Sequence, residues 1–234
     1  MTTPTPTDLE DLAAILEQSG DYKVLRRFQP RIAPINAPAP NERLGIFLDL
    51  ETTGLDPAKD EIIEIAMVPF LYTVGGDLLA VGEAFQSYQD PGISIPAEIT
   101  ALTGITDEMV QGQTIDLTQV EEHVGRAAII IAHNSAFDRK FAERLSPAFE
   151  TKPWACSMSQ IPWAAEGIRG SKLAYLAAAA GFFFDEHRAV TDCQAAIQIW
   201  ADLCPDLDRP PFPRSSMTPG KGPVAFGRKA LRST

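Results

Sequence analysis

The sequence predicts an α/β domain built on a mixed five-stranded sheet with helices packed on both faces. Three segments with alternating apolar residues, at 45–51, 61–73 and 77–89, are joined by short turns and predict an antiparallel meander. The apolar run AIIIAH at 128–133 is typical of a strand buried on both faces, and a short strand follows near 154–158. Strands first and helix-linked strands afterwards indicate a mixed sheet that is covered by helices.

The spacing of apolar residues predicts the helices that cover this sheet. Leu117, Val120 and Val124 recur at helical spacing on one face, and Gly181 is a typical residue for the end of a helix. The same pattern gives four helices in the second half of the domain, expected at 117–124, 136–145, 171–180 and 189–204.

Four zones divide the chain. Residues 1–28 are expected to form a short helical appendage, in which Asp8 caps the helix. Residues 29–42 contain four prolines and predict a stiff, extended linker. The α/β domain covers 43–204, and a basic tail rich in proline and glycine covers 205–234.

Composition narrows the class of protein. The chain of 234 residues has no run of 18 apolar residues, so we expect neither a membrane-spanning helix nor a membrane partner. The first residues, MTTPTPTDLEDL, lack the basic start and the apolar core of a secretory signal. Cys156, Cys193 and Cys204 show no paired spacing, which is typical of buried, reduced thiols. These features predict a cytoplasmic protein.

The net charge of −11 is unevenly distributed along the chain. Residues 209–234 contain six Lys or Arg and no acid, so the rest of the chain is strongly acidic. Acidic surfaces repel nucleic-acid phosphates, but bound metal ions can mask carboxylates locally. The charge therefore argues against duplex binding without arguing against a metal-dependent nuclease.

The stretch IFLDLETTG at 46–54 places two carboxylates at the end of an apolar strand. Because residues i and i+2 of a strand point to the same face, Asp49 and Glu51 are expected to lie side by side. Like charges at that spacing repel each other, and their burial is costly without a positive partner. The pair therefore predicts a compensating positive charge at the end of this strand.

Two further acids lie on the apolar faces of predicted helices. Asp138 and Asp192 each share helical spacing with apolar residues, so both should face the sheet. The apolar neighbours are Phe141, Ala142 and Leu145 for the first acid, and Ala195, Ala196, Ile199 and Leu203 for the second. We expect both acids to converge with the pair at the strand end. Taken singly, each also fits a helix-capping role, because acids are favoured in first turns.

Four converging carboxylates predict a site for divalent metal. Ligands that are all oxygen suit Mg²⁺ or Mn²⁺. Two such ions, roughly 3.5–4 Å apart, can stabilise the attacking and leaving oxygens of phosphodiester cleavage. His187, in the loop DEHRAV before the last helix, can face this cluster and take a proton from an attacking water. A lone histidine in a loop also commonly binds only to backbone groups.

Three segments carry these five residues in chain order. They are FLDLETTGLDPAKDEIIEIA with Asp49 and Glu51, IIAHNSAFDRKF with Asp138, and HRAVTDCQAA with His187 and Asp192. On these motifs, residues 44–201 resemble the DEDDh 3′–5′ exonucleases, a ribonuclease H-like family that includes the proofreading epsilon subunit of bacterial DNA polymerase III. The resemblance implies a ribonuclease H-like sheet, two metal ions held by the four acids, and a general base at His187.

The resemblance also implies where a terminal nucleotide would bind. The segment LTGITDEM at 102–109 is similar to the TGIT wall of the nucleotide pocket in this family. Residues beside the acids in the first two motifs would complete the pocket. The expected substrate-binding residues are Leu50, Thr52, Thr53, Gly104, Ile105, Asn134 and Phe137.

We therefore expect a metal-dependent 3′–5′ exonuclease that releases nucleoside monophosphates from single-stranded or frayed DNA ends, in proofreading or repair. Two alternatives stay open: a ribonuclease of the same family that trims RNA 3′ ends, and a non-catalytic subunit that binds a polymerase or a DNA end. The complete acid set favours catalysis, because a binding module has no use for four carboxylates that repel one another. The pentapeptide QTIDL at 113–117 is similar to motifs that bind a sliding clamp, although such short motifs arise easily by chance.

Overall fold

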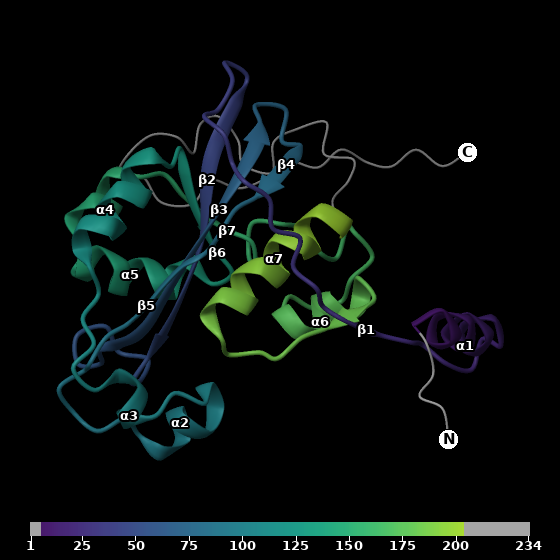
Figure 1. The fold of residues 1–234 in the computed structure, drawn as a ribbon, viewed down its shortest axis with the longest axis horizontal. Coiled ribbons are helices and arrows are strands. Elements are labelled where there is room, and N and C mark those ends of the chain that lie inside the picture. The colour runs from purple at the N-terminus through teal and green to yellow at the C-terminus, as the bar shows by residue number, and fades with distance from the viewer. Residues whose placement is uncertain (1–5, 204–234) are drawn as a thin grey trace.

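The computed structural model describes residues 6–203, and its centre is one mixed six-stranded sheet (Figure 1). In this sheet β2 pairs antiparallel with β3 and parallel with β6, and β6 pairs parallel with β7. Both β4 and β5 pair antiparallel with β3. The strands are β2 (Glu42–Thr52), β3 (Ile62–Thr73), β4 (Leu78–Val81), β5 (Phe85–Tyr88), β6 (Ile129–Ala132) and β7 (Trp154–Cys156). The predicted mixed sheet is confirmed.

The sheet has six strands where five were expected, because the segment predicted as one strand at 77–89 is divided. Gly82 lies opposite Pro69 of β3 and donates its N–H to the Pro69 carbonyl at 2.8 Å. Proline has no N–H, so the return hydrogen bond of this pair cannot form. The ladder is interrupted at this point, and β4 and β5 are separate strands along the same edge of β3.

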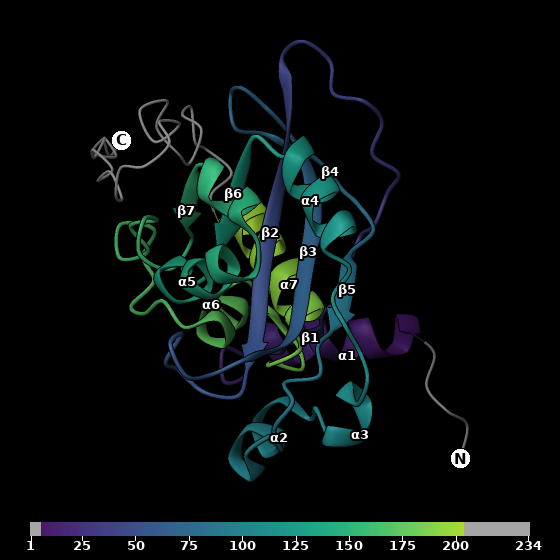
Figure 2. The same ribbon diagram turned by 90° about the vertical axis from the view of Figure 1, so that its left-hand side faces the viewer.

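Helices cover both faces of the sheet, as predicted (Figure 1). On one face lie α4 (Leu117–Arg126) and α5 (Ser135–Leu145), and on the other lie α6 (Leu173–Ala179) and α7 (Ala189–Leu203). The remaining helices are α1 (Pro6–Gln18), α2 (Ala97–Thr103), α3 (Asp107–Val110) and the 3₁₀ turn η1 (Pro147–Thr151). Figure 2 shows α2 and α3 beyond the end at which β2 terminates. No helix within residues 6–203 is both long enough and apolar enough to cross a membrane.

The side chains of β2 point alternately to the two faces of the sheet, and each face has its own hydrophobic core. Ile46, Leu48 and Leu50 belong to the core under α4 and α5. Phe47 belongs to the core on the face of α6 and α7. Because successive side chains of a strand point to opposite faces, Asp49 and Glu51 continue the Phe47 row and lie on the α7 face.

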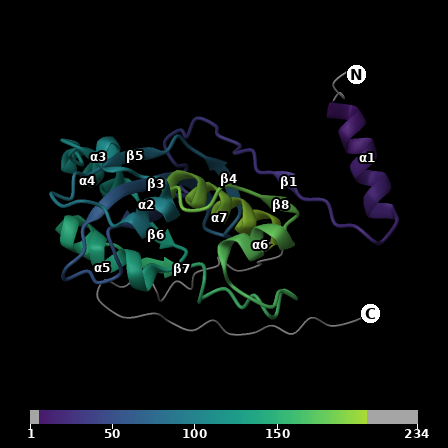
Figure 3. The ribbon, with the colours of Figure 1, turned by 90° about the horizontal axis from the view of Figure 1, so that it is seen from below.

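The segment after α1, which spans the end of the expected appendage at 1–28 and the start of the expected stiff linker at 29–42, is attached to the domain. Arg26–Arg27 forms the short strand β1, which pairs in parallel with β8 (Phe182–Phe183). The Phe28 ring lies 5.2 Å from the Phe182 ring, and the Arg27 guanidinium lies over the Phe183 ring. Further along, the Ala33 N–H donates to the Val81 carbonyl at 2.8 Å. We call residues 21–35 the N-terminal strap. Figures 1 and 3 show that α1, which precedes the strap, stands apart from the domain.

The segment QTIDL is part of the fold. Ile115 is buried, and its N–H donates to the Gln89 side chain at 3.0 Å. The Asp116 carboxylate accepts from the N–H groups of Thr118 and Gln119 and so caps α4. A clamp-binding motif must present its apolar residue to the clamp, so this placement contradicts the clamp-binding interpretation of 113–117.

Two of the three cysteines can be described. Cys156 and Cys193 are free and buried, as expected. Cys204 and the tail predicted at 205–234 lie outside the described residues.

Candidate active site

The four predicted acids meet at one end of the sheet. Asp49 and Glu51 lie near the end of β2 on the α7 face. The parallel strand β6 ends at Ala132, so the turn that follows brings the first turn of α5, with Asp138, to the same end. Asp192 lies in the first turn of α7, a helix that packs against β2 and β3. Strand ends and helix starts therefore deliver acids from three separate segments.

The proximity of these acids shifts their pKa values. Burial raises the pKa of Asp49 well above its usual value, and the charges of Asp138, Asp192 and Glu51 raise it further. Burial, followed by the charge of Asp192, raises the pKa of Glu51 to about 8. Such shifts require carboxylates that are both desolvated and close together.

The other two acids are perturbed for the same main reason. Burial raises the pKa of Asp138 to about 7, although backbone hydrogen bonds from Asp138 itself and Leu50 oppose the rise. Burial also raises the pKa of Asp192 to about 7, opposed by a backbone hydrogen bond from His187. At neutral pH and without a cation, the cluster therefore holds protons that a metal ion would displace.

Asp192 has one oxygen with a partner and one without. Its Oδ2 accepts the N–H of His187 at 3.1 Å. Its Oδ1 is buried and has no hydrogen-bond partner within the described part of the chain. A buried carboxylate oxygen without a donor is costly, and a bound cation would satisfy it.

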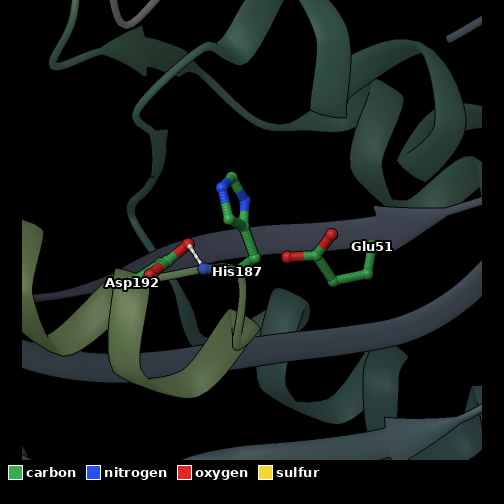
Figure 4. A group of neighbouring side chains, drawn as sticks. All are labelled: Glu51, His187 and Asp192. Atoms are coloured by element: carbon green, nitrogen blue, oxygen red, sulfur yellow. Dashed lines mark hydrogen bonds between the residues drawn. The ribbon is translucent and has the colours of Figure 1, made fainter. Parts of the chain in front are cut away.

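His187 lies beside the acids in a left-handed backbone conformation, with φ of 62°. Ligand atoms of Glu51, His187 and Asp192 lie within 4.8 Å of one another. Figure 4 shows the Glu51 carboxylate pointing toward His187, while the imidazole projects away from Asp192. Positive φ is uncommon for a residue with a side chain and is concentrated at functional sites.

The residues present fit a divalent metal ion. The four acids offer oxygen ligands only, which is the ligand set preferred by Mg²⁺ and Mn²⁺. Arg188, the neighbouring cation, opposes the rise in the pKa of Glu51. Its Nη2 donates to the Tyr88 hydroxyl at 2.9 Å and lies 3.9 Å from the Glu64 carboxylate, so this one cation cannot balance the charges of all four acids.

Sequence reasoning missed one charged residue of the site. Glu64 of β3 is fully buried, lies opposite Glu51 in the β2–β3 ladder, and raises the pKa values of Asp49, Glu51 and Asp192. The available signal was a single acid inside the apolar strand IIEIAMV, with isoleucines on both sides. Charged residues are almost never fully buried without a partner, so this position could have been recognised.

The residues predicted to bind a nucleotide are in part structural. The Thr52 hydroxyl donates to the Gly54 carbonyl at 2.6 Å, and the Thr53 hydroxyl accepts the Glu61 N–H at 3.0 Å. Gly104 ends α2 with φ of 72°, and the Ile105 side chain is fully buried beneath that turn.

The other three predicted nucleotide contacts lie closer to Asp138. Leu50 is buried next to the cluster, Asn134 is exposed just before α5, and the Phe137 ring lies 5.0 Å from the Phe141 ring. Contact of any of the seven residues with a nucleotide stays a prediction.

Comparison with known proteins shows which family the chain resembles. The RNase_T family model, described as an exonuclease, matches residues 46–200. The chain is 34% identical to the PolC-type DNA polymerase III of Clostridium perfringens, over 66% of this chain and 11% of that protein. It is 31% identical to the DNA polymerase III subunit epsilon of Aquifex aeolicus, over 69% of this chain and 81% of that protein. It is also 31% identical to the 3′-5′ exonuclease DinG of Bacillus subtilis, over 74% of this chain and 19% of that protein.

A solved structure shares the fold. Exonuclease X in complex with 5′ overhanging duplex DNA superposes with a TM-score of 0.51 at 24% identity, over 69% of this chain and 91% of that one. The mixed sheet and its acid cluster thus define a nuclease domain of ribonuclease H-like fold. The chain belongs to the exonuclease family, and the predicted resemblance to the DEDDh 3′–5′ exonucleases is confirmed. It spans about a tenth of the PolC-type relative and most of the epsilon subunit.

Proposed function

We propose that this chain is a metal-dependent 3′–5′ exonuclease that removes nucleoside monophosphates from single-stranded or frayed DNA ends. The observation that carries the proposal is the convergence of four mutually repelling carboxylates, of which Asp138 is buried and the other three are partly buried, and one of which keeps a buried oxygen without a hydrogen-bond donor. Such a cluster is unstable as a purely structural feature and is explained by a cation. The names of the DinG and epsilon relatives support the 3′–5′ polarity and the DNA substrate.

In this proposal the side chains of the cluster divide the work. Asp49, Glu51, Asp138 and Asp192 would hold two Mg²⁺ or Mn²⁺ ions. When bound, these ions supply charge stabilisation to the attacking and leaving oxygens of the phosphodiester. His187 would take the proton of the attacking water, because its side chain lies beside Glu51 without belonging to a helix. The terminal nucleotide would lie between the turn after β2 and the segment from α2 to α3.

Labelled strands test this proposal directly. Strands of DNA and RNA and mispaired primers, each labelled at the 5′ end, are incubated with Mg²⁺, Mn²⁺ or excess chelator. We expect a ladder shortened from the 3′ end of DNA, with mononucleotide products and no cleavage in chelator. Cleavage that persists in chelator, or internal cuts without stepwise shortening, would contradict the proposal. Equal or faster shortening of RNA would support the ribonuclease alternative.

We also propose that the domain acts beside a DNA polymerase. The PolC-type and epsilon relatives carry DNA polymerase III in their names, and this supports the partnership. Co-elution of the purified chain with the replicative polymerase of the same source would test it. Separate elution at micromolar concentrations of both proteins would count against a stable complex.

A further inference from the structure

Glu64 is a carboxylate that the proposed chemistry does not use. It is fully buried in the middle of β3, directly opposite Glu51. Its charge adds to the repulsion that the four metal-binding acids already exert on one another. A buried charge is costly unless donors compensate it, so a neutral residue here would reduce the repulsion in the metal-free fold.

Both oxygens of Glu64 are already engaged. Oε2 accepts the backbone N–H of Ala189 at 3.3 Å. Oε1 accepts the side-chain amide of Gln86, and the Arg188 Nη2 lies 3.9 Å from it. Donors on β5 and at the start of α7 thus hold the carboxylate in one orientation, and this sets it apart from Asp192, whose Oδ1 has no donor.

The hydrogen bond from Ala189 to Glu64 lies at the start of α7, between the two site residues His187 and Asp192 in the sequence. Ala189 is the first residue of α7, and its N–H is one of the groups that a helix start leaves without an intrahelical partner. Asp192 follows it by three residues, and His187 precedes it by two. An acceptor on β3 therefore fixes the first turn of α7 against the sheet that carries Asp49 and Glu51.

A second contact holds the same loop. The Arg188 Nη2 donates to the Tyr88 hydroxyl at 2.9 Å. Tyr88 is the partner of Glu64 across the β3–β5 ladder, and its ring packs beside the buried cluster that contains Ile105. The loop that carries His187 is thus tied to β3 through Glu64 and to β5 through Tyr88.

We propose that Glu64 is a positioning residue, which accepts the Ala189 N–H to place Asp192 and His187 opposite Asp49 and Glu51 and is not itself a metal ligand. The inference rests on the proposed function only in one respect, the expected effect of Glu64 substitutions on DNA cleavage. Its effect on metal binding can be measured without any nucleic acid. Groups that orient metal ligands in this way typically contribute 10- to 100-fold in metal affinity or activity.

Two variants separate orientation from charge. Glu64→Gln keeps the shape but places an NH₂ group against one of two donors. Gln86→Leu removes one donor to Glu64 and leaves every charge in place. Gln198→Leu is the matched control, because it deletes the same amide on α7, where Gln198 donates to Asp202 away from the site.

The measurements are Mn²⁺ affinity by calorimetry without a strand, kcat and KM on a single-stranded DNA, and Tm. We expect Glu64→Gln to lower both Mn²⁺ affinity and kcat by about 10-fold or more, with KM for the strand within about twofold. Gln86→Leu should lower both by a smaller factor, and Gln198→Leu should match the wild type.

Three outcomes would decide against the proposal or against the function. Wild-type Mn²⁺ affinity and kcat in Gln86→Leu, with a loss in Glu64→Gln, would show that Glu64 acts by charge alone and would overturn positioning. A lowered Tm with unchanged affinity and kcat in both variants would show a merely structural role and would also overturn it. A third outcome separates the two claims. If the wild type cleaves no strand but both Glu64→Gln and Gln86→Leu still bind Mn²⁺ more weakly than it does, positioning is supported and the proposed function is refuted.

Discussion

Each carboxylate of the cluster destabilises the metal-free folded protein and favours the binding of a metal ion. Asp49 shows this most strongly, because burial and four neighbouring acids raise its pKa well above the usual value. The metal-free protein must either protonate such groups or bear their repulsion. A bound cation removes that cost, so stability, pH and metal concentration are linked at this site.

Asp49→Asn should abolish cleavage and stabilise the metal-free protein. Asparagine keeps the shape of the side chain but removes a charged ligand and its repulsion. We expect Tm in chelator to rise by about 2–4 °C, the shift that ~1 kcal/mol produces in a chain of this size. Asp202→Asn, at the far end of α7, should change neither quantity. Undiminished cleavage by Asp49→Asn would refute its role as a ligand.

The stability of the metal-free protein should fall as pH rises from 5.5 to 8.5. The pKa of Glu51 is raised from 4.5 to about 8, and those of Asp138 and Asp192 are raised from 3.8 to about 7. A raised pKa means that the folded state binds more protons, so this stabilisation is complete below about pH 4 and is lost as pH passes 7 to 8. Melting curves in chelator measure it, and a flat or rising Tm would contradict it. Mn²⁺ affinity should rise over the same range, because the ligands must lose protons.

His187→Asn should lower kcat by about 10²–10⁴-fold and leave Mn²⁺ affinity within a few-fold. Asparagine is chosen because it tolerates the left-handed conformation that His187 adopts, so the loop is preserved while the imidazole is lost. His123→Asn on α4 is the control and should leave kcat unchanged. A kcat within tenfold of the wild type would remove His187 as the general base.

At the scale of elements, the site depends on how the start of α7 is held. The strand β8 precedes the His187 loop, and the N-terminal strap pairs with it through β1. The N–H groups of Arg26 and Phe28 donate to carbonyls of Gly181 and Phe183. The strap therefore braces the segment that leads into the loop, although its pairing residues lie in the part of the sequence that was expected to be a short helical appendage.

Phe28→Ala should loosen this brace. The ring is half-buried against Phe182, so we expect a loss of about 1–2 kcal/mol, less than for a core phenylalanine. The amides of Arg26 and Phe28 should then exchange with solvent faster, which hydrogen–deuterium exchange measures. Tyr22→Ala, at an exposed position in the same strap, is the control. Unchanged exchange at both amides would show that the pairing does not depend on the ring.

At the scale of the whole molecule, charge is unevenly distributed along the chain. The domain is acidic, whereas residues 209–234 carry six Lys or Arg and no acid. Cations on a tail can contact phosphates without sequence preference and release counterions. A tether of this kind would act on long strands and leave the chemistry of a short one untouched.

Deleting 209–234 should therefore leave kcat on a saturating 6-mer unchanged. It should raise KM for a 30-mer and flatten the salt dependence of that KM, because fewer counterions are released on binding. Truncated and full-length enzymes are compared on both strands from low to moderate salt. Equal salt slopes of the two enzymes on the 30-mer would reject the tether.

The sequence by itself determined the α/β class, the four acids and His187, because strand and helix periodicity is local and shows which acids face an apolar core. It did not show that Gly82 divides a strand, since the cause is a missing N–H on Pro69 of the neighbouring strand. Nor did it reveal the donors that hold Glu64, because Gln86 and Ala189 lie 22 and 125 residues away from it. These features were decided by tertiary structure, because a hydrogen bond between distant segments leaves no periodic pattern in either segment.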